Sequence, residues 1–143
     1  MAGSIVATTY ASKGRGIVRI DCALTCVSGA ISATPIGSAF GRIVGVAYEP
    51  TAGAGGTMTT TADLTLTDAV TGAVLIAEPD FGTARFERPT CAIVGATGVA
   101  VTPATTANDT NRDIFVAGKL NVTIANGTTT DTGLFSLFVE EGR

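Results

Sequence analysis

The sequence predicts an all-β protein, in which about eight to ten short antiparallel strands form a β-sandwich or a jelly-roll-like barrel. Hydrophobic and polar residues alternate with a period of two in several stretches, as in half-buried strands. Thr, Ala and Gly make up almost half of the 143 residues, whereas Leu, Glu and Lys are scarce and Gln is absent. This composition favours strands and turns over helices. The length fits one domain that spans residues 1–143.

The first predicted strands lie in the N-terminal third of the chain. Residues 5–10 alternate weakly, and we expect the segment 1–13 to be an extended arm or an edge strand, either in its own sheet or added to a neighbour. Residues 42–48 form another weak strand. The clearest alternation lies in residues 18–27, where five side chains share one face: Val18, Ile20, Cys22, Leu24 and Cys26.

A hairpin is predicted in the middle of the chain. Residues 63–67 alternate, a turn follows at 68–72, and an apolar run occupies 73–76. We expect Asp68 to accept hydrogen bonds from amides of this turn, because a short carboxylate commonly bonds the backbone two residues on.

The C-terminal part predicts two longer strands. Residues 119–124 alternate, Asn126-Gly127 is a strong turn dipeptide, and a return strand follows at 134–139. Weaker strands are expected at 92–94, 99–101 and 114–117. The polar or Gly-rich stretches 51–61 and 102–112 are typical of surface loops, and 140–143 of a solvated tail.

The composition excludes several classes of function. The chain has no His, so neither a His-based catalytic centre nor a His-ligated metal can form. Nine Lys and Arg residues and a net charge of −3 argue against nucleic-acid binding. Only 15% of residues are charged, and depletion of charge is typical of surfaces that another chain covers. We see neither a signal peptide nor a membrane span, and therefore expect assembly in a cytoplasm.

The three cysteines suggest core packing. Cys22 and Cys26 point the same way along one predicted strand, but four residues of strand span about 13 Å, too far for a disulfide or a shared metal ion. Cys91 stands alone. We expect all three thiols to be reduced.

Short motifs that are similar to known binding loops do not fit their templates. The Gly-rich stretch 53–56 lacks the Lys of a phosphate-binding loop, and 109–113 lacks the later Gly and Glu of a calcium loop. The Asn-x-Thr triplets at 108, 121 and 126 are expected by chance in a Thr-rich chain. Seven carboxylates are candidates for glycoside hydrolysis, but we expect none of them to act, because none has an aromatic-rich sequence context: Asp63, Asp68, Glu78, Asp80, Glu87, Glu140 and Glu141. We therefore predict no catalytic, cofactor-binding or metal-binding residue, no cofactor and no enzyme activity.

Three segments carry a family resemblance: GRIVGVAYEP (41–50), ADLTLTDAVTGAV (62–74) and GKLNVTIANG (118–127), the last followed by GLFSLFV (133–139). They resemble small virion proteins of tailed bacteriophages, of the capsid decoration (cement) type. The resemblance implies a protein that binds the major capsid protein on the outside of the head, commonly as a homotrimer, and stabilises the shell without catalysis.

Two other functions stay open from the sequence. The chain could be another virion part, such as a head–tail connector, a tail protein or a fibre-base protein. A carbohydrate-binding adhesin module that recognises a host-surface glycan is the third candidate, against which the absence of Trp argues.

Overall fold

The computed structural model describes residues 3–11, 16–50, 57–80, 84–87, 90–92, 111–128 and 130–141. The described residues contain no helix, so the all-β prediction is confirmed. The described residues form ten strands: β1 (Ser4–Ala11), β2 (Ile17–Thr25), β3 (Ile31–Glu49), β4 (Asp63–Asp68), β5 (Val74–Glu78), β6 (Arg85–Glu87), β7 (Thr90–Ala92), β8 (Asn111–Asp113), β9 (Phe115–Ala125) and β10 (Thr132–Glu141).

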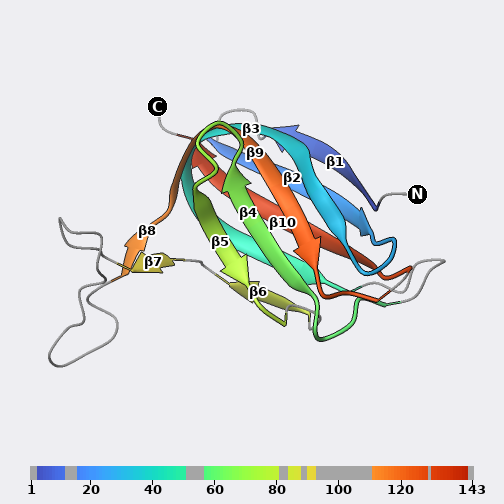
Figure 1. Cartoon of the computed structure of the whole chain (residues 1–143). Coiled ribbons are helices and arrows are strands. Elements are labelled where there is room, and N and C mark those ends of the chain that lie inside the picture. Colours follow the sequence, from blue (N-terminus) through green and yellow to red (C-terminus); the bar gives the residue numbers. More distant parts are fainter. Residues whose placement is uncertain are drawn as a thin grey trace, which may run out of the picture.

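Seven strands form one antiparallel sheet in the order β1-β2-β10-β3-β9-β4-β5 (Figure 1). β6 pairs with β3 beside this path, and β7 and β8 form a separate two-stranded sheet. The main sheet is curled but not closed, because its end strands β1 and β5 do not pair with each other. Within the segment 1–13, the described residues form β1, which is an end strand of the chain's own sheet.

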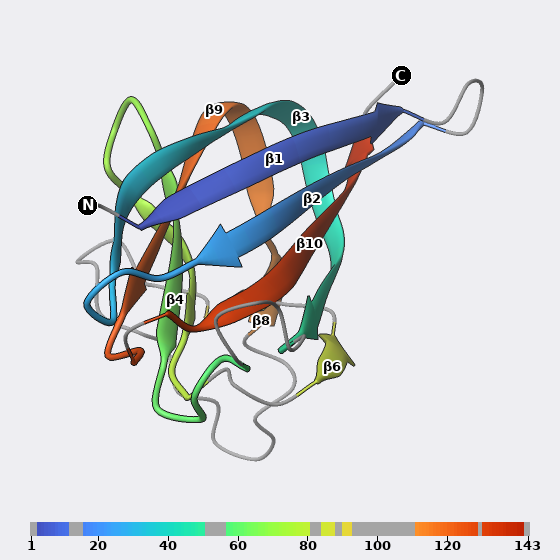
Figure 2. The same cartoon turned by 90° about the vertical axis from the view of Figure 1, so that its right-hand side faces the viewer.

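β3 lets the sheet curl, and at 19 residues it is much longer than the short strands that were predicted. Its first part pairs with β9 and its last part with β10, with register shifts in both ladders. Gly37 and Gly41 have φ values of 123° and 150°, which residues with a side chain rarely adopt. Figure 2 shows β3 curving round from β10 towards β1.

The predicted hairpin between 63 and 76 is confirmed as β4 and β5. Oδ1 of Asp68 accepts hydrogen bonds from the amides of Val70 at 2.9 Å and Thr71 at 2.7 Å, as expected of this turn. The hydrogen bonds from Thr71 are the largest cause that holds the pKa of the Asp68 carboxyl below its ordinary value, and the bond from the Val70 amide adds to it.

The return strand after Asn126-Gly127 does not form a hairpin with the strand before it. β10 pairs with β2 and β3, so β3 lies between β9 and β10 in the sheet. The turn instead crosses the end of the sheet: Asn126 has a φ of 55°, and the Gly127 amide donates to the carbonyl of Gly29 at 2.8 Å. A strong turn signal predicts the bend, whereas the pairing partner depends on distant strands.

The segment 57–61 is anchored at Met58 and Thr59, so the prediction of a free surface loop over 51–61 is wrong at these two residues. Met58 is buried, its amide donates to the carbonyl of Thr132 at 3.0 Å, and the Thr59 amide donates to Oδ2 of Asp131 at 2.9 Å. The same carboxylate oxygen accepts the Thr128 amide at 2.8 Å. Asp131 therefore ties this segment to the turn before β10.

The prediction of a solvated tail over 140–143 is wrong for its first two residues, and residues 142–143 lie outside the described residues. Glu140 and Glu141 belong to β10, and the Glu141 amide donates to the carbonyl of Gly16 at 2.6 Å. Several predictions fall outside the described residues: the loop residues 51–56, the 102–110 part of the second loop, the strand at 99–101, and the end of the strand at 92–94.

The core lies on the concave side of the curled sheet. It is one cluster to which β2, β3, β4, β5, β9 and β10 all contribute. Cys22 and Cys26 are free thiols in this cluster, so their predicted role in core packing is confirmed. The side chain of Cys91 is not described.

Candidate functional site

Large hydrophobic side chains gather on the outer face of the sheet, away from the core. The first group follows one cross-strand row, in which Tyr10 of β1 is opposite Arg19 of β2, Arg19 is opposite Phe138 of β10, and Phe138 is opposite Gly45 of β3. Residues that pair in adjacent antiparallel strands lie on the same face. The row therefore crosses four strands on the outside of the molecule.

The missing side chain at Gly45 makes room for an aromatic ring from β6. A Cβ at this position would lie 2.6 Å from Cζ of Phe86, so the Phe86 ring rests directly on the backbone of β3. The same ring meets Phe138 edge-on, with the ring centroids 5.7 Å apart. Such edge-to-face pairs are favourable, and they extend the row to the short strand β6.

The charges in this row are paired within the chain. The guanidinium carbon of Arg19 lies 5.3 Å from the centroid of the Tyr10 ring, and Nε of Arg19 donates to Oδ1 of Asp21 at 2.8 Å. The hydroxyl of Ser136 donates to the same oxygen at 2.6 Å. The hydrogen bond from Arg19 is the main cause that holds the pKa of the Asp21 carboxyl below its ordinary value, against the opposing effect of burial.

A second row lies beside the first. Ile17 of β2 is opposite Glu140 of β10, Glu140 is opposite Arg42 of β3, and Arg42 is opposite Phe115 of β9. Nη2 of Arg42 and Oε2 of Glu140 form an ion pair at 2.5 Å. Phe40 lies on the same face, two residues before Arg42.

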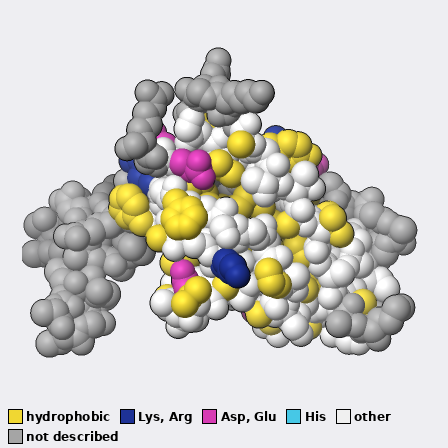
Figure 3. Space-filling model, turned by 90° about the horizontal axis from the view of Figure 1, so that it is seen from above, with side chains coloured by type: hydrophobic (Ala, Val, Ile, Leu, Met, Phe, Trp, Pro, Cys, Tyr) yellow, Lys and Arg dark blue, Asp and Glu magenta, His cyan; other side chains and the backbone are white. Residues whose placement is uncertain are grey.

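These two rows define a surface that we call the aromatic face: Tyr10, Ile17, Phe40, Phe86, Phe115 and Phe138. Phe40, Phe86 and Phe115 are each at least 60% exposed. Five of the eight large hydrophobic side chains that the described residues expose belong to this face. Figure 3 shows hydrophobic side chains gathered around a few charged ones on the surface seen from above.

The chemistry of the aromatic face is that of a docking surface. Large exposed apolar patches mark interaction sites, and aromatic side chains and Arg contribute most of the binding energy at many interfaces. The ion pair of Arg42 with Glu140 is already formed, so a partner need not supply a charge for either residue.

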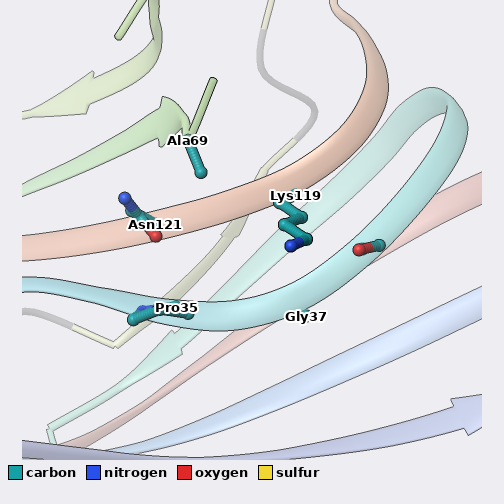
Figure 4. Close-up of a pocket in the computed structure, with 6 residues that line it drawn as sticks. Pro35, Gly37, Ala69, Lys119 and Asn121 are labelled. Carbon is teal, nitrogen blue, oxygen red and sulfur yellow. The ribbon is translucent and has the colours of Figure 1, made fainter. Parts of the chain in front are cut away.

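A second feature is an open hollow of about 270 Å³ between the turn after β4 and the adjoining parts of β3 and β9 (Figure 4). Its lining residues are Pro35, Gly37, Ser38, Ala69, Lys119 and Asn121. Oδ1 of Asn121 is buried there without a hydrogen-bond partner. The hollow is wide and lined chiefly by carbon atoms, so it offers few polar groups to orient a small ligand.

The carboxylates considered from the sequence do not converge on one site. Asp63 accepts hydrogen bonds from the amide of Asp80 at 3.1 Å and from Nδ2 of Asn126 at 2.5 Å. These bonds join the start of β4 to the residues that follow β5 and β9. Asp68 holds its turn. Glu140 lies within the aromatic face, and Phe138 precedes it by two residues in the sequence, so the expectation that no candidate carboxylate has aromatic neighbours is wrong at Glu140. The side chain of Glu87 is not described.

Sequence reasoning missed the aromatic face, although a signal for it exists. Phe115 lies between the buried residues Ile114 and Val116, and Phe138 lies between the buried residues Leu137 and Val139. Neighbouring residues in a strand point to opposite faces, so each of these rings had to point away from the core. An aromatic residue out of phase with the apolar alternation is the sign of an exposed ring.

Within the part of the chain that the structure describes, no three His, Cys, Asp or Glu residues are close enough to hold a metal ion. No helix in the described ranges is long and apolar enough to cross a membrane. The chain matches no known family model, no curated protein and no solved structure.

Proposed function

We propose that this chain is a capsid decoration (cement) protein of a tailed bacteriophage, which binds the outer surface of the major capsid protein shell and stabilises the head without catalysis. The observation that carries the proposal is the aromatic face: exposed rings on a continuous sheet, with the charges between them already paired. The resemblance of segments 41–50, 62–74 and 118–127 to such proteins supports the same function.

The composition agrees with a covered surface. Charged residues make up only 15% of the chain, and two of its acidic side chains, Asp21 and Glu140, are paired with Arg19 and Arg42 on this face. A surface with so little unpaired charge loses little hydration when it docks against an apolar partner. The aromatic rings then supply the apolar area that drives docking.

We infer a homotrimer on the shell, located at the virion surface and assembled in the host cytoplasm. Three linked copies bind a symmetric shell with an avidity that exceeds the affinity of one copy. Closed symmetry also covers apolar surface on each copy. Light scattering of the purified protein measures the number of copies.

The finer fold class belongs to the same proposal. We infer that the curled sheet is a β-sandwich of the jelly-roll kind, with β3 as the strand that belongs to both layers. The support is that β3 pairs with β9 through its first part and with β10 through its last part, while residues from both ends of the sheet fill one core.

The test is co-sedimentation of the purified protein with heads assembled from the major capsid protein of the same phage. Replacing Phe40 and Phe115 together by Ala is expected to weaken binding at least about tenfold, since both rings are exposed and would be buried at the contact. Replacing Val70 and Val74 by Ala is the matched control, because these side chains are as exposed but lie on the β4–β5 hairpin. Failure of the folded wild-type protein to bind such heads would contradict the proposal.

The remaining candidates give different results in two further measurements. Gold-labelled antibody on intact virions distinguishes the head from the tail, and labelling at the tail alone supports a connector, tail or fibre-base protein. Binding of the isolated protein to a glycan array supports an adhesin, for which the exposed Tyr10 and Phe rings would provide stacking surfaces.

A further inference from the structure

The free edge of β1 lacks the features that normally prevent strands from pairing with other chains. Among the described residues, β1 pairs only with β2. Its eight residues, SIVATTYA, include no charged residue, no Pro and no Gly, and all except Ile5 are exposed. Natural edge strands are usually short, bulged or charged, so β1 presents an unprotected row of backbone donors and acceptors.

The opposite edge of the same sheet is protected. β5 has five residues, ends with Glu78, and pairs with β4 through a register shift. Edge pairing through β1 alone joins two copies and then stops, because the described strands of each copy offer no second open edge of this kind.

The side chains of β1 are self-complementary in one antiparallel register. Val6 and Tyr10 are the large exposed residues of the strand, and Thr8 lies midway between them. If Thr8 faces Thr8 of a second copy, each Val6 lies opposite the other copy's Tyr10 on the outer face. Aromatic residues paired with β-branched residues across strands are stabilising.

We propose that β1 pairs antiparallel with β1 of a second copy of this chain, with Thr8 on the two-fold axis, so that the two sheets continue into one another. The axis is perpendicular to the sheet, so it brings the two outer faces to the same side. Because Tyr10 belongs to the aromatic face, the pairing joins two aromatic faces into one larger surface.

β1 is already held in the position that this pairing needs. Ile5 packs against the core, and a Cβ at Gly3 would lie 2.4 Å from the carbonyl oxygen of Ala30, so the strand begins in close contact with the chain before β3. Further along β1, Oγ1 of Thr9 would lie 3.7 Å from a Cβ at Gly37. An edge that is ordered before binding loses little conformational entropy when it pairs.

The two-fold contact goes beyond the proposed function, because it requires no shell. It is also compatible with a trimer, since a two-fold contact can link copies of two neighbouring trimers. Its test therefore measures whether the mass of the assembly in solution depends on β1, whatever the number of copies.

The test places like charges on the two-fold axis. Thr8→Lys is expected to halve the mass measured by light scattering and to weaken the association at least about tenfold, because the two Lys side chains would face each other. Thr8→Glu is expected to do the same. Mixing the two variants should restore the wild-type mass, because Lys of one copy then faces Glu of the other, and this recovery also shows that both variants fold.

Ala77→Lys is the matched control, because Ala77 is exposed on the other edge strand. It should leave the mass unchanged. The inference is overturned if Thr8→Lys has the same mass as the wild type, or if the mixture of Lys and Glu variants does not regain it. Loss of head binding by Thr8→Lys at unchanged mass would assign β1 to the shell and would equally overturn it.

Discussion

At the scale of single residues, Asp131 is a buried polar side chain that joins two described segments. It accepts bonds from the amides of Thr59 and Thr128 and from the Thr128 hydroxyl. Burial alone would raise the pKa of its carboxyl, but the bonds from Thr128 and Thr59 outweigh burial and lower the pKa below the ordinary value of 3.8.

Asp131→Ala is expected to lower the free energy of unfolding by about 1–3 kcal/mol, because two amides lose their acceptor. Asp131→Asn keeps an acceptor oxygen for these amides, so its free energy of unfolding should fall by less. A lowered pKa means that the charged carboxylate stabilises the fold above about pH 4 and that this stabilisation is lost as the pH falls below that value. Urea unfolding should therefore show the difference between wild type and Asp131→Asn shrinking between pH 7 and pH 3. A constant difference would contradict this role.

The two core thiols should be chemically inert in the folded protein. Burial is the main cause that raises the pKa of Cys22 to about 12 and that of Cys26 to about 11, with smaller contributions from Asp21 and Asp131. Because the thiolate is the reactive form, alkylation at pH 8 should be at least about a hundredfold slower than in urea. Peptide mass spectrometry measures both sites, and equal labelling in the folded and unfolded chains would be inconsistent with the prediction.

The raised pKa values of the thiols also mean that the free energy of unfolding falls at alkaline pH. The neutral thiols stabilise the fold below the ordinary pKa of 9.0, and this contribution is lost as the pH rises towards 11 or 12. Substitution of Cys22 by Ala removes its part of this loss, so the stability of the variant should fall less steeply above pH 9.

At the scale of elements, the antiparallel pairing of β3 with β10 depends on a glycine. A Cβ at Gly41 would lie 2.0 Å from the carbonyl oxygen of Glu140, which is backbone and cannot move aside easily. Gly41→Ala is expected to lower the free energy of unfolding by about 3 kcal/mol or more, from the clash and from the φ of 150° together.

Gly118 is a matched control for this substitution. Its φ is 143°, close to that of Gly41, but a Cβ there would meet nothing within 4 Å. Gly118→Ala should therefore show the backbone strain without the clash. Chemical denaturation compares the two variants, and equal destabilisation would mean that the close approach of β10 has no energetic consequence.

The elements that the sequence predicts well are those that local chemistry determines. Asp68 and the turn that it holds predict the β4–β5 hairpin, because donor and acceptor lie within three residues. The pairing of β10 with β2 and β3 could not be predicted from Asn126-Gly127, because a turn dipeptide does not select a partner about one hundred residues away. The burial of Met58 cannot be predicted for the same reason, since it joins a core built from distant strands.

At the scale of the whole molecule, the sequence predicts a surface that another chain covers, but not where that surface lies. Low charge describes the chain as a whole, whereas the aromatic face exists only after β3 and β10 bring Phe40 and Phe115 beside the row of Tyr10 and Phe138. Its location depends on register, and a shift by one residue would turn each of these rings towards the core.

If the chain docks onto heads as proposed, this distribution of charge predicts that the docking is insensitive to salt. The chain has nine basic and twelve acidic residues, and on the aromatic face Arg19 and Arg42 are paired with Asp21 and Glu140. Salt screens attraction between unpaired charges of two partners, but leaves apolar contacts intact. The affinity for heads should therefore change by less than about threefold between about 50 mM and about 500 mM NaCl, measured by co-sedimentation. A steep loss of affinity with salt would show that charges, rather than the aromatic rings, carry the contact.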